Sequence, residues 1–296
     1  MSQTPVSEIV KTLDAPDAAM VKRLLERGMM IPVQPRVLEE LRQQMLKKEF
    51  DVRVLARIIN SDPGIVAMLF KACGNSAYKQ HQPFHSVDEI LHAVGVRQVF
   101  NLVQAISVAS LKDEKTNPEA YESFWVRSQA VAQLAMIVAD ERIAVCNIFP
   151  DQAYLAGMFH DCGVALLLRR FSTYCKEMKL NEPGRWIDLA EEDAKFKADH
   201  CVVGYLVAKH WGLPDFICDA IRNHHDIQRI GSHESRSMVA ILQLAIHLYY
   251  LDLRVENREW AGVADAVLGE LGIHDDALPE FVDIALDRFH RAEECV

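Results

Sequence analysis

The chain has 296 residues, and because 50% of them are hydrophobic it is long enough to bury one large core or two medium-sized ones. Its 42 acidic residues outnumber the 32 basic ones, and the net charge of −10 disfavours nucleic acid as a partner because it repels a phosphate backbone. Residues 1–28 contain no apolar run long enough for a signal peptide or a membrane span, so we expect a cytoplasmic protein that does not contact a membrane.

Apolar residues recur at spacings of three and four along nearly the whole chain, as in Val37, Leu38, Leu41 and Met45. This period is that of one face of an α-helix, and it predicts an all-α fold. The seven cysteines form an odd set without a C-x-x-C pair, which indicates reduced, buried thiols rather than disulfides.

Prolines and glycines mark the expected helix boundaries. Helices are predicted to carry a proline in their first turn at Pro35, Pro63, Pro118 and Pro150. They are predicted to end at Gly28, Gly74, Gly95, Gly212 and Gly272. Ser86 and Glu89 have the spacing of a capping box.

Residues 51–78 contain two short helical stretches that meet at a turn, as a helix-turn-helix motif would. The second stretch is apolar and offers only Lys71 to a phosphate, whereas a recognition helix needs several polar side chains. Core packing is the better interpretation. The polar stretch 111–120 then predicts a boundary between an N-terminal helical subdomain, residues 1–113, and a second one, residues 114–296.

Histidines give the strongest chemical signal, since several lie within about 65 residues of predicted helix. They are His160, which precedes Asp161, then His200, His210, His224 and His225. A single histidine on a helix is more often a structural residue than a ligand. Together, however, imidazoles and a carboxylate suit zinc, iron or manganese, and a helical bundle can bring them to one inward-facing site.

Two segments with these histidines, AYLAGMFHDCGVALLL and DHCVVGYLVAKHWGLPDFICDAIRNHHD, resemble the HD superfamily and specifically its HD-related output domain (HDOD) branch. In the first half, IPVQPRVLEEL, LARIINSDPGIVAMLFKACGNSAY and HSVDEILHAVGVRQVFNLV resemble the same family, so the resemblance covers residues 31–250. It implies an N-terminal helical bundle packed on an HD-like helical domain, and a regulatory role in bacterial signalling rather than catalysis.

The resemblance also implies which metal ligands the HD enzymes would place on this chain. His160 and Asp161 match the HD pair, and His200, His224 and His225 match further ligands of the two-metal HD-GYP branch, although the GYP signature itself is absent. Two other ligand positions are lost. Arg127, in FWVRSQAVAQLAMIVAD, stands where the enzymes have a histidine, and Ile246, in SMVAILQLAIHLYYL, stands where they have an aspartate, within a register uncertainty of one residue.

Arg127 is the more telling replacement, because a guanidinium keeps its proton and repels a divalent ion by about 8 kcal/mol at 4 Å and an effective dielectric of 20. We expect Arg127 to neutralise Asp161 in place of a metal, through a bidentate pair. The alternative is that Arg127 points to solvent, as most arginines do. Cys162 and Cys201 follow Asp161 and His200, but neighbours on a helix point about 100° apart, so both are expected to be structural thiols.

Beyond residue 255, two amphipathic stretches are expected to close the bundle or to form the face of a homodimer. The preferred function is a non-catalytic regulatory protein without a cofactor, which binds a signalling protein, a small ligand or a nucleotide. The alternative is a metal-dependent phosphohydrolase with a reduced site of His160, Asp161, His200 and one or both of His224 and His225, holding iron, manganese or zinc. A DNA-binding regulator is a weaker third hypothesis.

Overall fold

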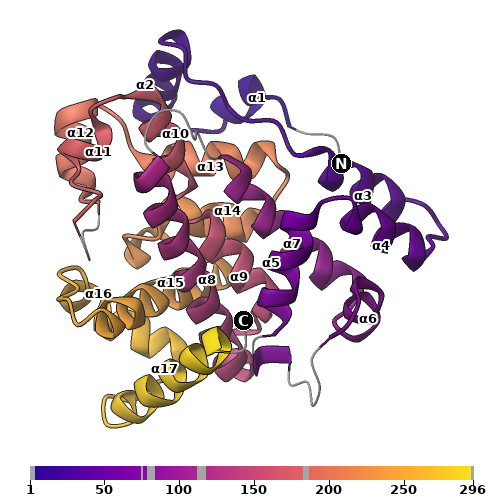
Figure 1. Cartoon of the computed structure of the whole chain (residues 1–296). Coiled ribbons are helices and arrows are strands. Elements are labelled where there is room, and N and C mark those ends of the chain that lie inside the picture. Colours follow the sequence, from indigo (N-terminus) through magenta and orange to yellow (C-terminus); the bar gives the residue numbers. More distant parts are fainter. Residues whose placement is uncertain (1–3, 75, 79–83, 112–117, 183–186, 295–296) are drawn as a thin grey trace.

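The computed structural model describes residues 4–74, 76–78, 84–111, 118–182 and 187–294. All secondary-structure elements within these ranges are helices, and none is a strand, which confirms the all-α prediction (Figure 1). Among the described residues, no helix combines the length and the apolar character that crossing a lipid bilayer requires. The predicted boundary between residues 113 and 114 lies outside the described residues.

A set of short helices forms the part of the molecule on the right of Figure 1. They are α3 Arg36–Met45, α4 Val52–Asn60, α5 Pro63–Cys73, α6 Val87–Ala93 and α7 Val96–Val108, with 3₁₀ turns at Ser76–Tyr78 and Ala109–Leu111. Helix α5 packs against α4 and α7 and buries Ile65 and Leu69. This apolar contact agrees with the interpretation of the stretch 51–78 as core rather than as a DNA-reading motif.

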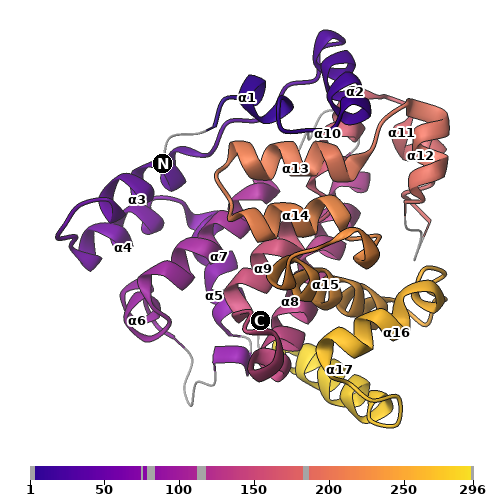
Figure 2. The same ribbon diagram turned by 180° about the vertical axis from the view of Figure 1, so that it is seen from behind.

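The 29-residue helix α8, Pro118–Cys146, runs through the middle of the molecule and packs against α9 and α15 (Figures 1 and 2). Around it lie the helices that carry or flank the histidines. These are α9 Pro150–Phe159, α10 Cys162–Arg170, α13 His200–His210, α14 Asp215–Asn223 and α15 His233–Asp252. The short helices α11 Tyr174–Glu177 and α12 Leu189–Phe196 connect α10 to α13.

Two further segments dock on this framework. The N-terminal helices α1 Val6–Val10 and α2 Ala15–Glu26 pack against α13, and Asp17 of α2 forms an ion pair with Arg222 of α14. The C-terminal helices α16 Trp260–Leu271 and α17 Leu278–Glu294 pack against α8 and α15 and close the bundle.

The carbonyl oxygen of Trp211 joins the two halves of the chain. It accepts hydrogen bonds from Gln34 Nε2, from Arg42 Nη2 at 3.0 Å and from Gln104 Nε2 at 3.1 Å. The indole Nε1 of Trp211 donates in turn to the Pro32 carbonyl at 2.9 Å. Trp211 itself is fully buried, so this corner is part of the scaffold.

Most helix boundaries follow the sequence signals. Pro63, Pro118 and Pro150 are the first residues of their helices, and Gly28, Gly212 and Gly272 have positive φ angles of 92°, 69° and 61°. One prediction was off by one residue, because Pro35 has an extended ψ of 146° and precedes the first residue of α3. Helices α5 and α6 end just before Gly74 and Gly95, as predicted, although Gly74 is right-handed with φ of −70° and Gly95, with φ of 102°, also directly precedes α7.

The predicted capping box at Ser86 is only half present. The Ser86 hydroxyl accepts from the Glu89 backbone N–H at 3.1 Å, as predicted. The Glu89 carboxylate, however, accepts from the backbone N–H of His85 at 2.7 Å, one residue earlier than a capping box requires.

Candidate functional site

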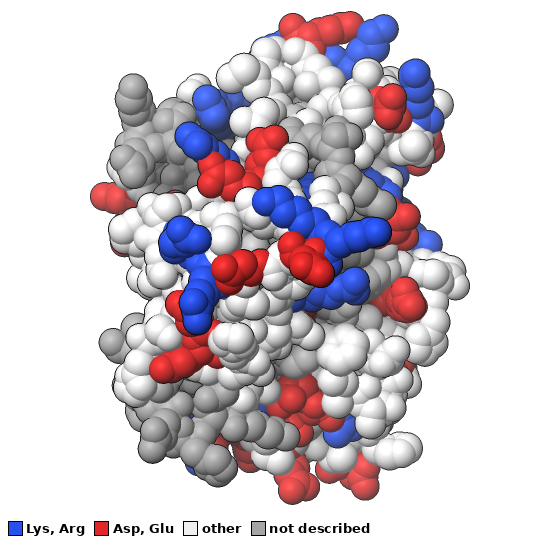
Figure 3. All heavy atoms as spheres, turned by 90° about the vertical axis from the view of Figure 1, so that its right-hand side faces the viewer, with Lys and Arg blue, Asp and Glu red and all other residues white. Residues whose placement is uncertain are grey.

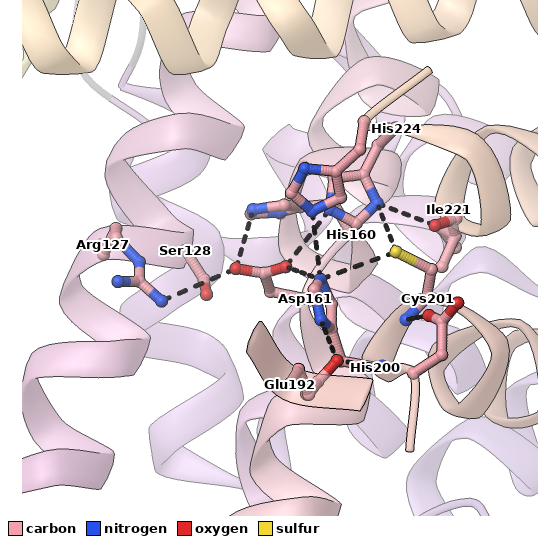
Figure 4. A network of polar contacts seen from close by, with 12 residues as sticks. Arg127, Ser128, His160, Asp161, Glu192, His200, Cys201, Ile221 and His224 are labelled. Carbon is pink, nitrogen blue, oxygen red and sulfur yellow. Dashed lines mark hydrogen bonds and ion pairs between the residues drawn. The ribbon is translucent and has the colours of Figure 1, made fainter. Parts of the chain in front are cut away.

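Asp161 lies at the centre of the candidate site (Figure 4). It stands between α9 and α10, because His160 caps the end of α9 and Asp161 precedes the first residue of α10. Its side chain is 2% exposed, and a carboxylate so deeply buried needs compensating charge or polar contacts. The surrounding helices supply them from both sides.

The two carboxylate oxygens of Asp161 face different partners. Oδ1 lies 3.2 Å from Nε2 of His200 and 3.3 Å from Nε2 of His224. Oδ2 lies 3.5 Å from Nε2 of His160 and 3.5 Å from Nη2 of Arg127. The structure therefore brings together residues of α8, the α9–α10 turn, α13 and the end of α14, as the resemblance implied.

Backbone carbonyls orient two of the imidazole rings. Nδ1 of His160 lies 2.5 Å from the carbonyl oxygen of Gly157, and Nδ1 of His224 lies 2.8 Å from that of Ile221. Since a carbonyl only accepts, Nδ1 must carry the proton in both rings. In a neutral ring Nε2 is then left with a lone pair, and in both residues Nε2 is the atom that faces Asp161.

Carboxylates orient the other two rings. Nδ1 of His200 lies 2.9 Å from Oε2 of Glu192, and Nδ1 of His225 lies 2.9 Å from Oε2 of Glu259. The Nε2 atoms of His200 and His225 then face each other at 3.2 Å. Two lone pairs repel at this distance, so this contact requires a cation between them, either a proton or a metal ion.

Glu192 was not identified from the sequence. It is fully buried in α12, and its carboxylate accepts from the backbone N–H of His200 at 2.9 Å and from the hydroxyl of Tyr174. No periodic spacing relates Glu192 to His200, because a chain turn separates their helices. The only sequence signal was an acidic residue in a helix that precedes the histidine.

Cys201 does not behave as predicted, because its thiol belongs to the cluster. Sγ lies 3.5 Å from Nε2 of His200 and 3.8 Å from Nδ1 of His224. Although neighbouring side chains diverge on a helix, the long imidazole of His200 reaches back beside the thiol. Cys162, in contrast, contacts the carbonyl oxygen of Gly204, and burial raises the pKa of its thiol, as expected for a structural cysteine.

The cluster has donors suited to one metal ion on the Oδ1 side of Asp161. The ligand atoms of His200, Cys201, His224 and His225 lie within 4.8 Å of one another. In a tetrahedral zinc site with bonds of about 2.1 Å, neighbouring donors lie about 3.4 Å apart, close to the separations around Oδ1. Metal-bound histidines also donate their second ring N–H to a carboxylate or carbonyl, as these rings do.

Electrostatics keep Asp161 ionised. Burial by itself would raise the pKa of Asp161, but the charge of His160 and the contacts with His160, His200 and His224 outweigh it, so the pKa lies well below its usual value. Burial likewise opposes a charge on His200, yet Cys201 and the Glu192 carboxylate raise the pKa of His200 well above its usual value. A proton on His200 would therefore supply the cation between His200 and His225 without a metal.

Arg127 lies against Asp161 rather than in solvent, since its side chain is only 11% exposed. Its guanidinium carbon lies 5.7 Å from the centre of the Phe124 ring. The guanidinium thus approaches the carboxylate from the side opposite His200 and His224 (Figure 4). Positive charge at Oδ2 disfavours a metal ion on that side.

Ile246 is buried in α15, and an apolar side chain there cannot serve as a ligand. Its neighbour His247 stacks on Trp260, with ring centres 3.9 Å apart, next to the Glu259 that contacts His225. His210 stands apart from the cluster and contacts the carbonyl oxygen of Thr4.

Comparisons with known proteins show which family the sequence matches. The sequence matches the HDOD domain family over residues 31–227. A protein of unknown role from Treponema pallidum is 19% identical over 202 residues, which cover 67% of this chain but only 38% of the relative, so the chain spans well under half of that protein.

Several solved structures share the fold. A candidate metal-dependent phosphohydrolase from Shewanella amazonensis is 17% identical with a TM-score of 0.71, over 94% of this chain and 96% of that one. An HDOD domain protein of unknown function from Geobacter sulfurreducens is 22% identical with a TM-score of 0.63, over 91% and 96%. A candidate signal transduction protein from Marinobacter aquaeolei is 22% identical with a TM-score of 0.66, over 99% and 68%.

Proposed function

The chain belongs to the HDOD domain family, and on this basis we propose that it is a non-catalytic regulatory protein of signal transduction. It acts by binding, with a signalling protein or a small ligand such as a nucleotide as its partner. The family supplies the scaffold, whereas the case against catalysis depends on the residues around Asp161.

One observation carries this proposal, namely the position of Arg127. Its guanidinium lies 3.5 Å from Oδ2 of Asp161, where an HD enzyme would use a histidine to hold a metal ion. A fixed positive charge at this place compensates the buried carboxylate and makes the same oxygen a poor metal ligand. The apolar Ile246 supports the proposal, because by the family resemblance it stands, within one residue, where the enzymes have an aspartate.

Surface charge supports a protein or small-molecule partner over nucleic acid. On the face shown in Figure 3, Lys and Arg are interspersed with Asp and Glu rather than gathered into a basic surface. The net charge of −10 also disfavours nucleic acid as a partner. A second copy of the chain remains an alternative partner within this proposal.

A metal-dependent phosphohydrolase is the second candidate function, and the Oδ1 side of Asp161 favours it. Asp161, His200, His224 and His225 would hold one iron, manganese or zinc ion there, with Cys201 beside it. Such an ion lowers the pKa of a bound water and so supplies a nucleophile. Glu192 and Glu259 would keep two of the imidazoles oriented.

Turnover of bis(p-nitrophenyl) phosphate tests the two candidates against each other. The protein is loaded in turn with manganese, iron or zinc, and an Asp161→Asn variant prepared in the same way measures the background. The regulatory proposal expects equal rates for the two proteins with every ion. A rate well above that of Asp161→Asn, together with one tightly bound ion per chain, would establish the hydrolase instead.

A further inference from the structure

A cavity of about 240 Å³ lies between the loop that follows α2 and the far end of α10. Arg27, Met29, Leu111, Leu166, Arg169 and Arg170 contribute to its wall. None of the lining residues belongs to the cluster around Asp161. The cavity therefore forms a second concave site, and nothing in the chemistry of the first site accounts for it.

The described charged residues that line this cavity all have one sign. Three of its lining residues are arginines, and no described carboxylate lines it, in a chain whose net charge is −10. Nε of Arg170 is buried and has no hydrogen-bond partner among the described residues. Positive groups that no described carboxylate compensates attract an anion, and the planar guanidinium fits the oxygens of a phosphate particularly well.

Hydrogen bonds fix the wall of the cavity before any ligand binds. Gly28, with its positive φ of 92°, ends α2, and the backbone N–H of Met29 donates to the Leu24 carbonyl at 3.0 Å. The Pro32 carbonyl is held by the indole of Trp211. On the other side, Leu166 is almost fully buried within α10. A preformed site of this kind loses little conformational entropy on binding.

Size and lining define the class of ligand. A volume of about 240 Å³ lies below the usual range for drug-sized pockets, which begins near 300 Å³, so the occupant is small. We propose that this cavity binds a small phosphate monoester, with the phosphate at Arg27, Arg169 and Arg170 and an apolar portion against Met29, Leu111 and Leu166. This site is independent of whether the Asp161 cluster is catalytic.

Titration calorimetry of the full chain at low salt tests the proposal with three probes. Phenyl phosphate carries both chemical features, inorganic phosphate carries the anion alone, and phenol carries the apolar ring alone. We expect one phenyl phosphate per chain, bound at least tenfold more tightly than either of the other two. Binding should weaken as salt rises, because exposed charges are screened.

Variants localise the binding. Arg169 is exposed, so Arg169→Ala should fold normally and weaken phenyl phosphate binding at least tenfold, and Arg27→Ala should act in the same direction. Arg291→Ala, in an arginine side chain that is 73% exposed on α17, is the matched control and should bind as the wild type does. Absence of binding in the wild type, or equal affinity in the Arg169→Ala and Arg291→Ala variants, would overturn the proposal. If inorganic phosphate binds as tightly as phenyl phosphate, the part of the proposal that places an apolar portion of the ligand against Met29, Leu111 and Leu166 is overturned.

Discussion

Arg127 and Asp161 form an ion pair in the interior of the protein, with Nη2 and Oδ2 3.5 Å apart and side chains 11% and 2% exposed. The pair connects the long helix α8 to the turn between α9 and α10. It also divides the surroundings of Asp161 into two halves, with arginine and His160 at one oxygen and His200 and His224 at the other. This division decides what the site can hold.

Loss of the arginine should destabilise the fold. In an Arg127→Ala variant the buried carboxylate keeps its histidine contacts but loses a charged partner, and we expect the free energy of unfolding to fall by about 1–3 kcal/mol. Urea denaturation measures it. Arg36→Ala is the control, since the Arg36 side chain is 91% exposed, and should change stability by less than about 0.5 kcal/mol. An Arg127→Ala variant that neither loses stability nor gains metal affinity would contradict the role of the pair.

Glu192 should be required to hold His200. Replacing Glu192 by glutamine keeps the shape but removes the charge, so the contact with His200 Nδ1 loses its ionic part, and we expect a loss of about 1–3 kcal/mol in unfolding free energy. Glu191→Gln, on the neighbouring residue whose pair with Lys195 is at the surface, should cost less than about 1 kcal/mol. Equal stabilities of the two variants would argue against the positioning role.

Close packing of α10 on α13 makes Gly163 irreplaceable. A Cβ at this position would lie 2.0 Å from the carbonyl oxygen of His200, which is backbone and cannot move aside. We expect Gly163→Ala to cost at least about 3 kcal/mol or to prevent folding. Gly269→Ala is the control, because a Cβ there meets nothing within 4 Å and the helix α16 gains up to about 1 kcal/mol from alanine. Thermal melting compares them, and a tolerated Gly163→Ala would show that the two helices lie farther apart.

His247 should make stability depend on pH. Burial lowers the pKa of His247 from 6.5 to about 4, so the folded state resists a proton that the unfolded state accepts. The contribution of His247 is complete above pH 6.5 and is lost as the pH falls from 6.5 towards 4. Because the ring is only partly buried, we expect about 1–2 kcal/mol.

The comparison that isolates His247 is His247→Phe, which keeps a ring next to Trp260 but cannot titrate. Unfolding free energies at pH 7 and pH 4.5 should fall less in this variant than in the wild type. Equal losses in the two proteins would assign the acid sensitivity to other groups.

Much of the fold followed from local patterns in the sequence. Helical periodicity predicted an all-α chain, and the prolines at 63, 118 and 150 marked helix starts, because local steric preferences decide both. The boundary at Pro35 was off by one residue, because proline also suits the position just before a helix and only the path of the chain selects between the two places.

The candidate site was predictable where the family pattern named its residues and unpredictable where tertiary contacts formed it. His160, Asp161, His200, His224 and His225 lie together, and Arg127 faces the carboxylate. Glu192 could not be predicted, because a chain turn separates its helix from the helix that begins at His200, and no regular spacing relates the two residues. Cys201 was misassigned because ideal side-chain directions on a helix neglect the length of an imidazole ring.

We propose that Arg127 excludes a metal ion from the Oδ2 side of Asp161, and manganese stoichiometry after equilibrium dialysis tests this claim most directly. The measurement compares the wild type with the double variant Arg127→His, Ile246→Asp, which restores both missing ligand types. We predict at most one ion per wild-type chain and one additional ion in the double variant. Two ions in the wild type, or no gain in the correctly folded double variant, would contradict the claim.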